Sequence, residues 1–472
     1  MENEMKQINV LRLTLVVALG GLLFGYDTAV ISGATQALQV YFSLSPAQLG
    51  FAAASALIGC VVGAAVAGFL SSRYGRRGAL IIAAVLFLIS AIGSAIAGSE
   101  VVFIIYRIIG GVGVGIASMV SPMYIAEISP AEKRGGLVAC NQFAIIFGML
   151  VVYFVNYGIA LMGPESWLNQ IGWRYMFGSE TIPAVLFLIL LFSVPETPRW
   201  LAMQGRDDQA RQLLKGLNPT LSIEPLWDDI KASLHHKSVS IKEQGLTGLL
   251  VIGILLSVFQ QVTGINVFLY YAPTILKGFS NSSIDIALLQ TVLVGVVNLS
   301  FTVLAILTVD KFGRRPLMMI GAAIMSVSII VIGTAAYLHA IGGYLLIFVL
   351  AYIAAFALSL GPVTWVLLSE IFPNNVRSKA LSIAVLAQWV ANFLVSQTFP
   401  MMNAKSSWIY QQFNGGFPFW LYGILGFVTV YFVYRFVPET KGRSLEQLEA
   451  LWQRKEKKTT PGTSEQHHPV AH

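Results

Sequence analysis

The sequence predicts an all-α membrane protein whose twelve transmembrane helices form two pseudo-symmetric halves of six. Three observations predict this class: the composition, the number of long apolar stretches, and an internal repeat. Of the 472 residues, 56% are hydrophobic and 11% are charged, and the mean hydropathy is +0.71. Such a composition leaves too little polar surface to cover a water-soluble globule, so a polytopic membrane protein is expected.

Twelve stretches are long and apolar enough to cross a bilayer, since a helix needs about 20 apolar residues to span a hydrocarbon core of about 30 Å. The first is longer than the core of a signal peptide, and no small-residue cleavage site follows it, so we expect it to be retained. The predicted spans are roughly 9–33, 47–70, 79–98, 100–125, 136–160, 172–194, 246–276, 286–309, 316–338, 342–371, 379–402 and 416–436.

The basic residues gather on one side of the predicted spans. The turns on that side hold Arg73, Arg76, Arg77, Lys133, Arg134, Lys311, Arg314, Arg315, Arg377 and Lys379. The turns on the other side hold Arg174, Lys277 and Lys405, and Arg107 falls inside a span. This asymmetry predicts that both termini are cytoplasmic. Topology thus accounts for the net charge of +7, and we expect no nucleic-acid partner.

An internal repeat relates the two halves. Three motifs recur in the same order at separations of 238, 243 and 243 residues: SRYGRR (72–77) as DKFGRR (310–315), YIAEISPAEKRG (124–135) as LLSEIFPNNVRS (367–378), and VPETPR (194–199) as VPETKG (437–442). Each copy contains six predicted spans, so the copies have parallel topology about an axis along the membrane normal.

The repeat also sets the predicted domain boundaries. We expect a first six-helix half over 1–195 and a second over 246–440. Between them, 196–245 is polar and charged, which predicts a cytoplasmic, partly helical linker. The tail, 441–472, is expected to be cytoplasmic and disordered at its end, because it is too polar to pack.

Several classes of function find no support. Cys60 and Cys140 lie in apolar stretches, where they are best explained as small hydrophobes. No histidine lies well inside a span, so neither a metal centre nor a histidine proton relay is expected. GGVGVG at 110–115 lacks the dinucleotide-binding spacing, and Gly111 and Gly115 instead favour close helix packing. No phosphate-binding loop is present. We therefore expect neither an enzyme nor a cofactor, and the energy must come from a gradient.

The motifs resemble those of the sugar porters of the major facilitator superfamily. They are RYGRR, KFGRR, PETPRW, PETKGRSLEQLE and QQVTGINVFLYYAP, and together they cover essentially the whole chain. The resemblance implies a monosaccharide importer in a bacterial inner membrane, with D-xylose as the substrate. The partners that we expect are the sugar, a proton and the lipid bilayer, and we expect the chain to function as a monomer. One departure is Ser72, which stands where the family has an acid, whereas Asp310 keeps it.

Charged residues near the predicted cytoplasmic ends form a candidate gate. They could serve only as topology anchors. The resemblance favours an ion-pair network that closes the cytoplasmic side in the outward-facing state, and such pairs are individually weak, as a latch requires. The candidates are Arg73, Arg77, Glu127, Arg134, Glu180 and Arg199 in the first half and Asp310, Arg314, Glu370, Arg377 and Glu439 in the second.

The candidate sugar site is polar but uncharged. Amides suit a sugar because hydroxyl groups both donate and accept hydrogen bonds, aromatic rings cover its C–H faces, and helix breakers such as Gly264 and Gly361-Pro362 are expected where backbone lines a cavity. The alternative is that the amides only join helices. The candidates are Phe24, Gln142, Gln260, Gln261, Asn266, Tyr270, Asn298, Gly361, Trp365, Gln388 and Trp389. The resemblance supports the amides, Trp365 and Trp389 but not Asn392, which we assign to packing.

Asp27 and Arg107 are the candidate proton-coupling pair. Asp27 is the only charged residue between Arg12 and Arg73, and an ionised group in mid-bilayer costs at least about 2.5 kcal/mol, so such residues usually pair and function. A static salt bridge is the alternative. The resemblance implies that Asp27 carries the proton. A facilitative uniporter would have no use for it, and a membrane sugar sensor would be expected to carry a longer tail.

Overall fold

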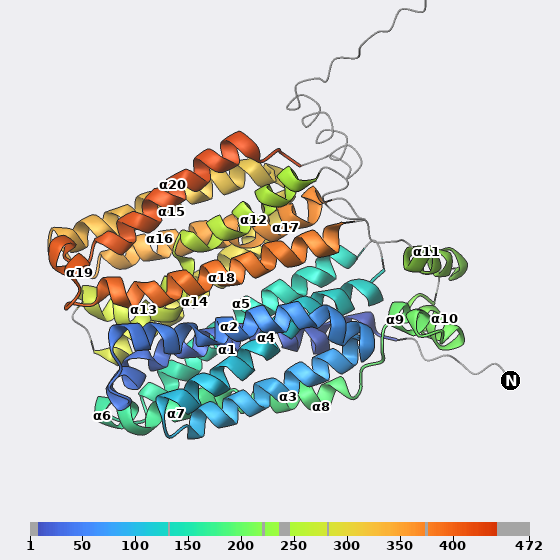
Figure 1. Cartoon of the computed structure of the whole chain (residues 1–472), viewed down its shortest axis with the longest axis horizontal. Helices are drawn as coiled ribbons and strands as arrows, with labels where there is room; N and C mark the ends of the chain where they lie inside the picture. Colours follow the sequence, from blue (N-terminus) through green and yellow to red (C-terminus); the bar gives the residue numbers. More distant parts are fainter. Residues whose placement is uncertain are drawn as a thin grey trace, which may run out of the picture.

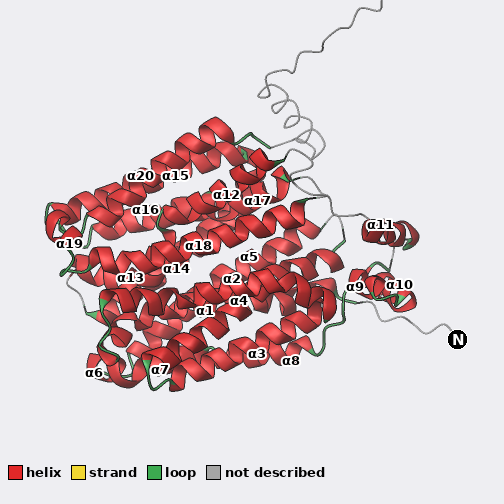
Figure 2. Cartoon of the chain, viewed as in Figure 1, coloured by secondary structure: helices red, strands yellow, loops and turns green. Residues whose placement is uncertain are grey.

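The computed structural model describes residues 8–130, 133–219, 222–235, 246–280, 283–372 and 376–440, and of residues 233–235, 280, 310, 369, 377 and 378 it describes the backbone alone. Within these ranges the chain is helical and contains no strand (Figure 2). Twelve helical segments are long and apolar enough to span a membrane. The predicted all-α fold with twelve spans is confirmed.

The first half consists of five continuous helices and one composite span. The continuous helices are α1 (Val10–Tyr41), α2 (Pro46–Arg73), α3 (Gly75–Ile96), α4 (Glu100–Ile128) and α5 (Arg134–Ala160). The sixth span is assembled from α6 (Glu165–Trp167), the π-helix η1 (Leu168–Gly172), α7 (Trp173–Ser179) and α8 (Thr181–Leu191).

The second half repeats this plan with two interrupted spans. Its helices are α12 (Thr247–Val262), α13 (Ile265–Ser280), α14 (Ile284–Phe312), α15 (Arg314–Tyr337), α16 (Leu345–Leu358), α17 (Leu360–Ile371), α18 (Arg377–Asn403), α19 (Trp408–Phe413) and α20 (Phe417–Phe436). The pairs α12–α13 and α16–α17 each make one span.

Both interruptions follow from a residue that cannot continue a helix. Gly264 has φ +91°, in the left-handed region that favours glycine, and it separates α12 from α13. Pro362 has no N–H to donate to the carbonyl of Leu358, and α16 ends at that leucine. The break itself lies at Ser359 and not at Gly361-Pro362 as expected, because proline is tolerated in the first turn of α17.

Small residues let α4 approach α2 closely. A Cβ atom on Gly111 would lie 1.8 Å from the carbonyl oxygen of Ala56, and one on Gly115 would lie 2.4 Å from that of Cys60. The helices therefore touch through their backbones, as the glycine spacing predicted.

The segment that links the two halves along the chain contains three short helices, which form a cluster of their own: α9 (Pro198–Met203), α10 (Asp207–Leu217) and α11 (Glu224–His235). Their apolar side chains gather around Trp227, which is 4% exposed. They lie at the same end of the bundle as the start of α1, where Ile8 N donates to the carbonyl oxygen of Gly216 at 3.1 Å, and α6 and α19 lie at the opposite end (Figure 1). We call these ends the linker end and the distal end.

The halves meet through α2 and α18, α5 and α14, and α1 and α13. At the distal end, Lys277 Nζ lies 3.2 Å from both Glu165 Oε1 and Gln36 Oε1, which ties α13 of the second half to the first half. The hydroxyl groups of Thr35 and Thr274 lie 3.2 Å apart across the same interface.

Candidate functional site

A buried ion pair joins α1 and α4 in the first half. Arg107 Nη1 donates to Asp27 Oδ1 at 2.7 Å, and Nη2 donates to the main-chain carbonyl of Asp27 at 3.0 Å. Both side chains are at most 1% exposed. The guanidinium also lies 5.4 Å from the centre of the Phe177 ring. The structure thus brings together the two charges proposed from the sequence as a pair.

Glu180 belongs to this cluster, so its prediction as a cytoplasmic gate residue is wrong. It stands between α7 and α8, is 1% exposed, and lies within hydrogen-bonding reach of the Asp27 carboxyl group. The physical reason is helix length. Leu191, where α8 ends, is eleven residues further along, which places Glu180 about 16 Å inside the bundle at a rise of about 1.5 Å per residue.

The two acids keep unused oxygens. Asp27 Oδ2 and both carboxyl oxygens of Glu180 are buried and receive no hydrogen bond from the described residues. Two ionised carboxylates that face each other repel, whereas one proton between them makes a hydrogen bond. The site is tightly packed, because a Cβ atom on Gly110 would lie 3.1 Å from Asp27 Oδ1. This cluster can therefore bind and release a proton.

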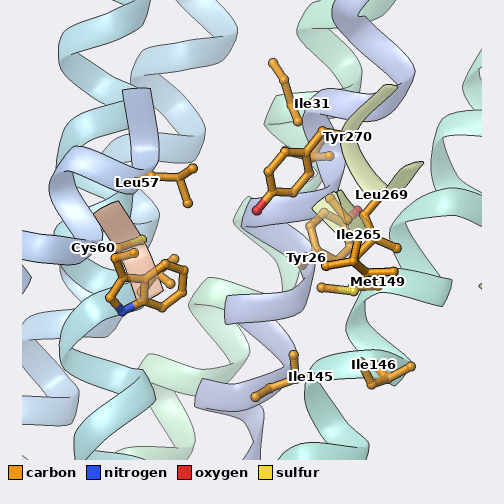
Figure 3. Close-up of a cluster of buried hydrophobic side chains, with 14 of the residues drawn as sticks. Tyr26, Ile31, Leu57, Cys60, Ile145, Ile146, Met149, Ile265, Leu269 and Tyr270 are labelled. Carbon is orange, nitrogen blue, oxygen red and sulfur yellow. The ribbon is translucent and has the colours of Figure 1, made fainter. Parts of the chain in front are cut away.

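Apolar side chains from both halves surround this region. Figure 3 shows Tyr26 of α1 and Met149 of α5 near Leu269 and Tyr270 of α13, with Cys60 of α2 standing apart from these four. All five are buried, each at most 7% exposed. Asp27, Arg107 and Glu180 are themselves at most 1% exposed, so their charges have little access to bulk water.

Amides at the interrupted spans form a chain of hydrogen bonds. Gln260 Nε2 donates to the carbonyl oxygens of Leu360 and Gly361 at 2.9 and 3.0 Å. Gln261 Nε2 donates to Gln260 Oε1 at 3.3 Å, and Asn266 Nδ2 donates to Gln261 Oε1. The breaks in the two spans therefore meet, and they bring four of the predicted sugar-site residues together.

Aromatic rings from the two halves also meet. The ring centres of Phe24 on α1 and Trp389 on α18 lie 5.6 Å apart. Trp389 Nε1 and Gln388 Oε1 are buried and have no hydrogen-bond partner among the described residues. Buried polar atoms are normally paired, so this donor and this acceptor are suited to the hydroxyl groups of a sugar.

The remaining predicted sugar-site residues are less tightly linked. Gln142 and Asn298 form no hydrogen bond with the residues that the structure describes. Asn298 is buried, and Gln142 and Trp365 are half-buried. Asn392 Nδ2 donates to the hydroxyl group of Tyr270 at 3.3 Å. The structure thus links Asn392, assigned to packing from the sequence, to a predicted site residue.

Two matching ion-pair clusters lie at the linker end. In the first half, Arg76 donates to Glu127 with an Nη2–Oε1 distance of 2.8 Å, and Thr197 Oγ1 donates to Glu127 Oε2 at 2.6 Å. In the second half, Arg314 Nη2 donates to Glu370 Oε1 at 2.9 Å, with Thr440 beside it at 2.5 Å from Oε2.

A second pair of acids caps helices at this end. Glu196 accepts from the backbone N–H groups of Arg76 and Arg77 at 2.9 and 3.1 Å, at the start of α3. Glu439 accepts from those of Arg314 and Arg315 at 3.0 and 3.1 Å, at the start of α15. A carboxylate at a helix N-terminus satisfies free donors and complements the helix dipole. Burial raises the pKa of the Glu196 carboxyl group.

The candidate gate residues thus separate into groups. Glu127, Arg314 and Glu370 form ion pairs, each within one half. Arg77 caps the end of α8 by donating from Nε to the carbonyl oxygen of Leu191 at 3.0 Å, and Glu439 caps α15. Three arginines are exposed and form no ion pair with the described part of the chain: Arg73, Arg134 and Arg199. The side chains of Asp310 and Arg377 lie outside the described residues.

Two residues of the linker end, Arg76 and Glu196, were missed among the candidates from the sequence. The internal repeat could have found them. Glu196 stands 243 residues before Glu439, and Arg76 stands 238 residues before Arg314, at the separations of the repeated motifs. Applying the repeat residue by residue would have predicted both clusters from either copy.

Comparison with known proteins agrees with this architecture. The family model described as "Sugar (and other) transporter" matches residues 13–452. The D-xylose-proton symporter of Escherichia coli (strain K12) is 54% identical, over 97% of this chain and 99% of that protein.

Solved structures agree as well. A partially occluded, inward-open conformation of the xylose transporter XylE from E. coli superposes with a TM-score of 0.83 at 53% identity, covering 92% of this chain and 99% of that one. The major facilitator superfamily proton:xylose symporter XylE bound to 6-bromo-6-deoxy-D-glucose gives 0.80 at 54% identity, over 94% and 99%. The predicted major facilitator fold is confirmed. The chain belongs to the sugar (and other) transporter family.

Proposed function

We propose that this protein is a secondary active transporter that imports D-xylose together with a proton by alternating access. The observation that carries the proposal is a buried cluster of two acids and one arginine, Asp27, Glu180 and Arg107, in the half that faces the amide chain across the bundle. The similarity to a D-xylose-proton symporter supports the choice of sugar and of coupling ion.

The charge of the cluster explains why a proton is needed. With both acids ionised, two negative charges and one positive charge leave a net charge of −1 inside the bundle. An uncompensated charge in the membrane interior costs at least about 2.5 kcal/mol. A single proton bound between Asp27 and Glu180 makes the cluster neutral and joins the two carboxyl groups by a hydrogen bond. We infer that the halves rock while the cluster is neutral.

The second half holds the sugar. Gln388 Oε1 and Trp389 Nε1 offer a buried acceptor and a buried donor, and the amides of Gln260, Gln261 and Asn266 fix the breaks in the two interrupted spans. Phe24 lies against Trp389, one helical turn before Asp27 on α1. A movement of α1 that follows sugar binding would therefore also move the proton-binding acid.

The distribution of basic residues supports a membrane orientation with the linker end in the cytoplasm. The arginines of both repeated motifs lie at that end, as the positive-inside rule requires. In this orientation the protein spans a bacterial inner membrane with both termini inside. Each half contributes to the site within one chain, so the protein functions as a monomer.

The proposal is tested with purified protein in liposomes that carry an imposed pH gradient, acidic outside. Labelled D-xylose should accumulate against its gradient, and unlabelled D-xylose should compete better than D-glucose, D-galactose or L-arabinose. Asp27→Asn should abolish accumulation, because asparagine cannot carry a proton, while exchange of sugar across the membrane stays within about twofold of the unsubstituted protein.

Each other outcome selects a different function. Undiminished accumulation by Asp27→Asn would sink proton coupling through this residue. Equilibration without accumulation by the unsubstituted protein would identify a facilitative uniporter. Sugar binding without any uptake would identify a membrane sugar sensor. Stronger competition by a hexose would replace D-xylose as the substrate while leaving the coupling intact.

A further inference from the structure

A hydrogen bond joins the two residues that precede the acids in the chain. The Tyr26 hydroxyl oxygen lies 2.7 Å from Ser179 Oγ, although 153 residues separate them in the chain. Tyr26 precedes Asp27 on α1, and Ser179 precedes Glu180 at the end of α7. Tyr26 is only 2% exposed. Two side-chain hydrogen bonds between α1 and α7 are found among the described residues. The bond from Arg174 Nη2 to the Tyr41 hydroxyl group, at 2.9 Å, lies at the last residue of α1, and the Tyr26–Ser179 bond joins the neighbours of the two acids.

The direction of this hydrogen bond follows from a third group. Ser179 Oγ lies 2.6 Å from the main-chain carbonyl oxygen of Met176, which can only accept. A serine hydroxyl has a single proton, so that proton is used in the contact with Met176. The Tyr26 hydroxyl group is consequently the donor to Ser179 Oγ. The chain of hydrogen bonds from Tyr26 to Ser179 and from Ser179 to Met176 holds α1 against the last turn of α7.

Nothing else among the described residues fixes the Glu180 side chain by a conventional hydrogen bond. Both of its oxygens lack a donor, whereas Asp27 is fixed by Arg107 through one side-chain and one main-chain hydrogen bond. Tyr26 and Ser179 are the chain neighbours of Asp27 and Glu180, and the Tyr26 hydroxyl group lies close enough to the Glu180 carboxyl group for the two to interact electrostatically. The distance between the two carboxyl groups thus depends on how this pair docks the two helices.

We infer that Tyr26 and Ser179 are positioning residues, which hold the Asp27 and Glu180 carboxyl groups close enough to share a proton. This inference rests on the function proposed above. Removing either hydroxyl group lets the acids separate. A proton held between two carboxylates is bound more weakly when they move apart, so stronger acid is needed to load the cluster. The pH profile of driven uptake reports this change.

The other groups near Asp27 do not confuse that readout. Asp27 interacts electrostatically with Glu180, with Arg107 on α4, with Cys60 on α2 and with Tyr270 on α13. Arginine stays charged, and a buried thiol and phenol stay neutral, throughout the range in which uptake is measured. The two carboxyl groups are therefore the groups of this set whose charge changes with pH.

The test uses the full chain in liposomes and the variants Tyr26→Phe and Ser179→Ala. Each should shift the pH profile of proton-driven D-xylose uptake to lower pH by at least about half a unit, which is about threefold in proton affinity. D-xylose exchange at fixed pH should stay within about twofold of the unsubstituted protein. The double variant should shift the profile no further, because both changes remove one interaction.

Tyr271→Phe is the matched control. It removes another buried tyrosine hydroxyl group, which donates to the main chain of Ser396 at 2.9 Å and touches neither acid, so its pH profile should not move. Unshifted profiles for Tyr26→Phe and Ser179→Ala, with accumulation abolished by Asp27→Asn, overturn the positioning role alone. Accumulation that survives Asp27→Asn overturns the proposed function instead. If Tyr26→Phe fails to fold, the smaller change Ser179→Ala decides.

Discussion

Three acids of the first half differ in their surroundings, and each environment decides what the carboxylate can do. Asp27 is bonded to a guanidinium, Glu180 has no donor among the described residues, and Glu196 accepts from backbone N–H groups at the start of α3. Only the first two face each other, so only they can share a proton. Glu196 is instead a helix cap whose charge complements the helix dipole.

We predict that acidification stabilises the protein relative to its Glu196→Gln variant. The pKa of Glu196 is raised in the folded protein. At pH values between the ordinary glutamate pKa of about 4.3 and this raised pKa, the folded chain therefore holds a proton that the unfolded chain lacks. The stability due to this proton is fully present below the ordinary value and is lost as pH rises through the raised one.

Apparent unfolding temperatures in detergent at pH 7 and pH 5 check this prediction. The difference between the unsubstituted protein and Glu196→Gln should move in favour of the unsubstituted protein at pH 5. A difference that is constant, or that moves the other way, would show that the carboxyl group of Glu196 is not protonated preferentially in the folded state.

At the scale of elements, the interrupted spans give the second half its polar surface. A continuous helix uses its backbone groups internally, whereas the breaks at Gly264 and Ser359 release carbonyl groups. Tyr352 donates to the carbonyl oxygen of Thr263 at 2.7 Å beside the first break, and Gln260 donates to two carbonyl groups just after the second. The Tyr352 bond satisfies a carbonyl group released by the first break. The two carbonyl groups that accept from Gln260 belong to the first turn of α17, so these bonds hold the Gln260 amide against the second break.

Gly264→Ala should therefore damage sugar binding. Its φ of +91° disfavours any side chain, and the added Cβ would lie 2.7 Å from Cδ2 of Tyr422. Strain of about 1–2 kcal/mol, with this clash added, should lower D-xylose affinity and uptake at least about tenfold. Tryptophan fluorescence titration and liposome uptake measure the two quantities.

Gly278→Ala on α13 is the control for that substitution. The same span carries Gly278, but a Cβ atom there meets nothing within 4 Å, so affinity and uptake should stay within about twofold. Equal behaviour of the two variants would mean that the break at Gly264 does not shape the sugar site.

Apolar length and the internal repeat were sufficient to predict the twelve spans and their two halves, because both can be read directly from the order of residues along the chain. The sequence also singled out Asp27 and Arg107, since charges within spans are rare. Glu180 was assigned to the cytoplasmic gate from the family resemblance, although the predicted span 172–194 already placed this residue inside the membrane. Hydrogen bonds such as Tyr26 to Ser179 depend on the packing of distant helices, which no local pattern encodes.

At the scale of the whole molecule, the halves are tied together at the distal end. Lys277, Glu165 and Gln36 link them there, and Gln397 Nε2 of α18 donates to the carbonyl oxygen of Ala47 on α2 at 2.9 Å. In the orientation proposed above, which places the linker end in the cytoplasm, contacts between the halves at the distal end belong to an inward-facing arrangement. The bonds at the distal end must break before sugar can enter from outside.

We predict that Lys277→Ala and Glu165→Gln each shift the population toward the outward-open state. A partly exposed ion pair contributes about 0.2–1 kcal/mol, which corresponds to a change of about 1.4-fold to fivefold in the ratio of the two states. Distance distributions between spin labels across the distal end measure this ratio. The reversed pair, Glu165→Lys with Lys277→Glu, should restore it, and single variants without effect would rule out a latch at this point.

The separation of chemistry between the halves bears on how such a molecule evolves. The acids and the arginine of the charge cluster all come from the first half, whereas the hydrogen-bonded amide chain lies wholly in the second. Under the proposed function, substitutions in the amide chain can therefore change the sugar contacts of the second copy while the proton-binding residues of the first copy are kept. Phe24 and Gln142 are the predicted sugar contacts that the first copy contributes.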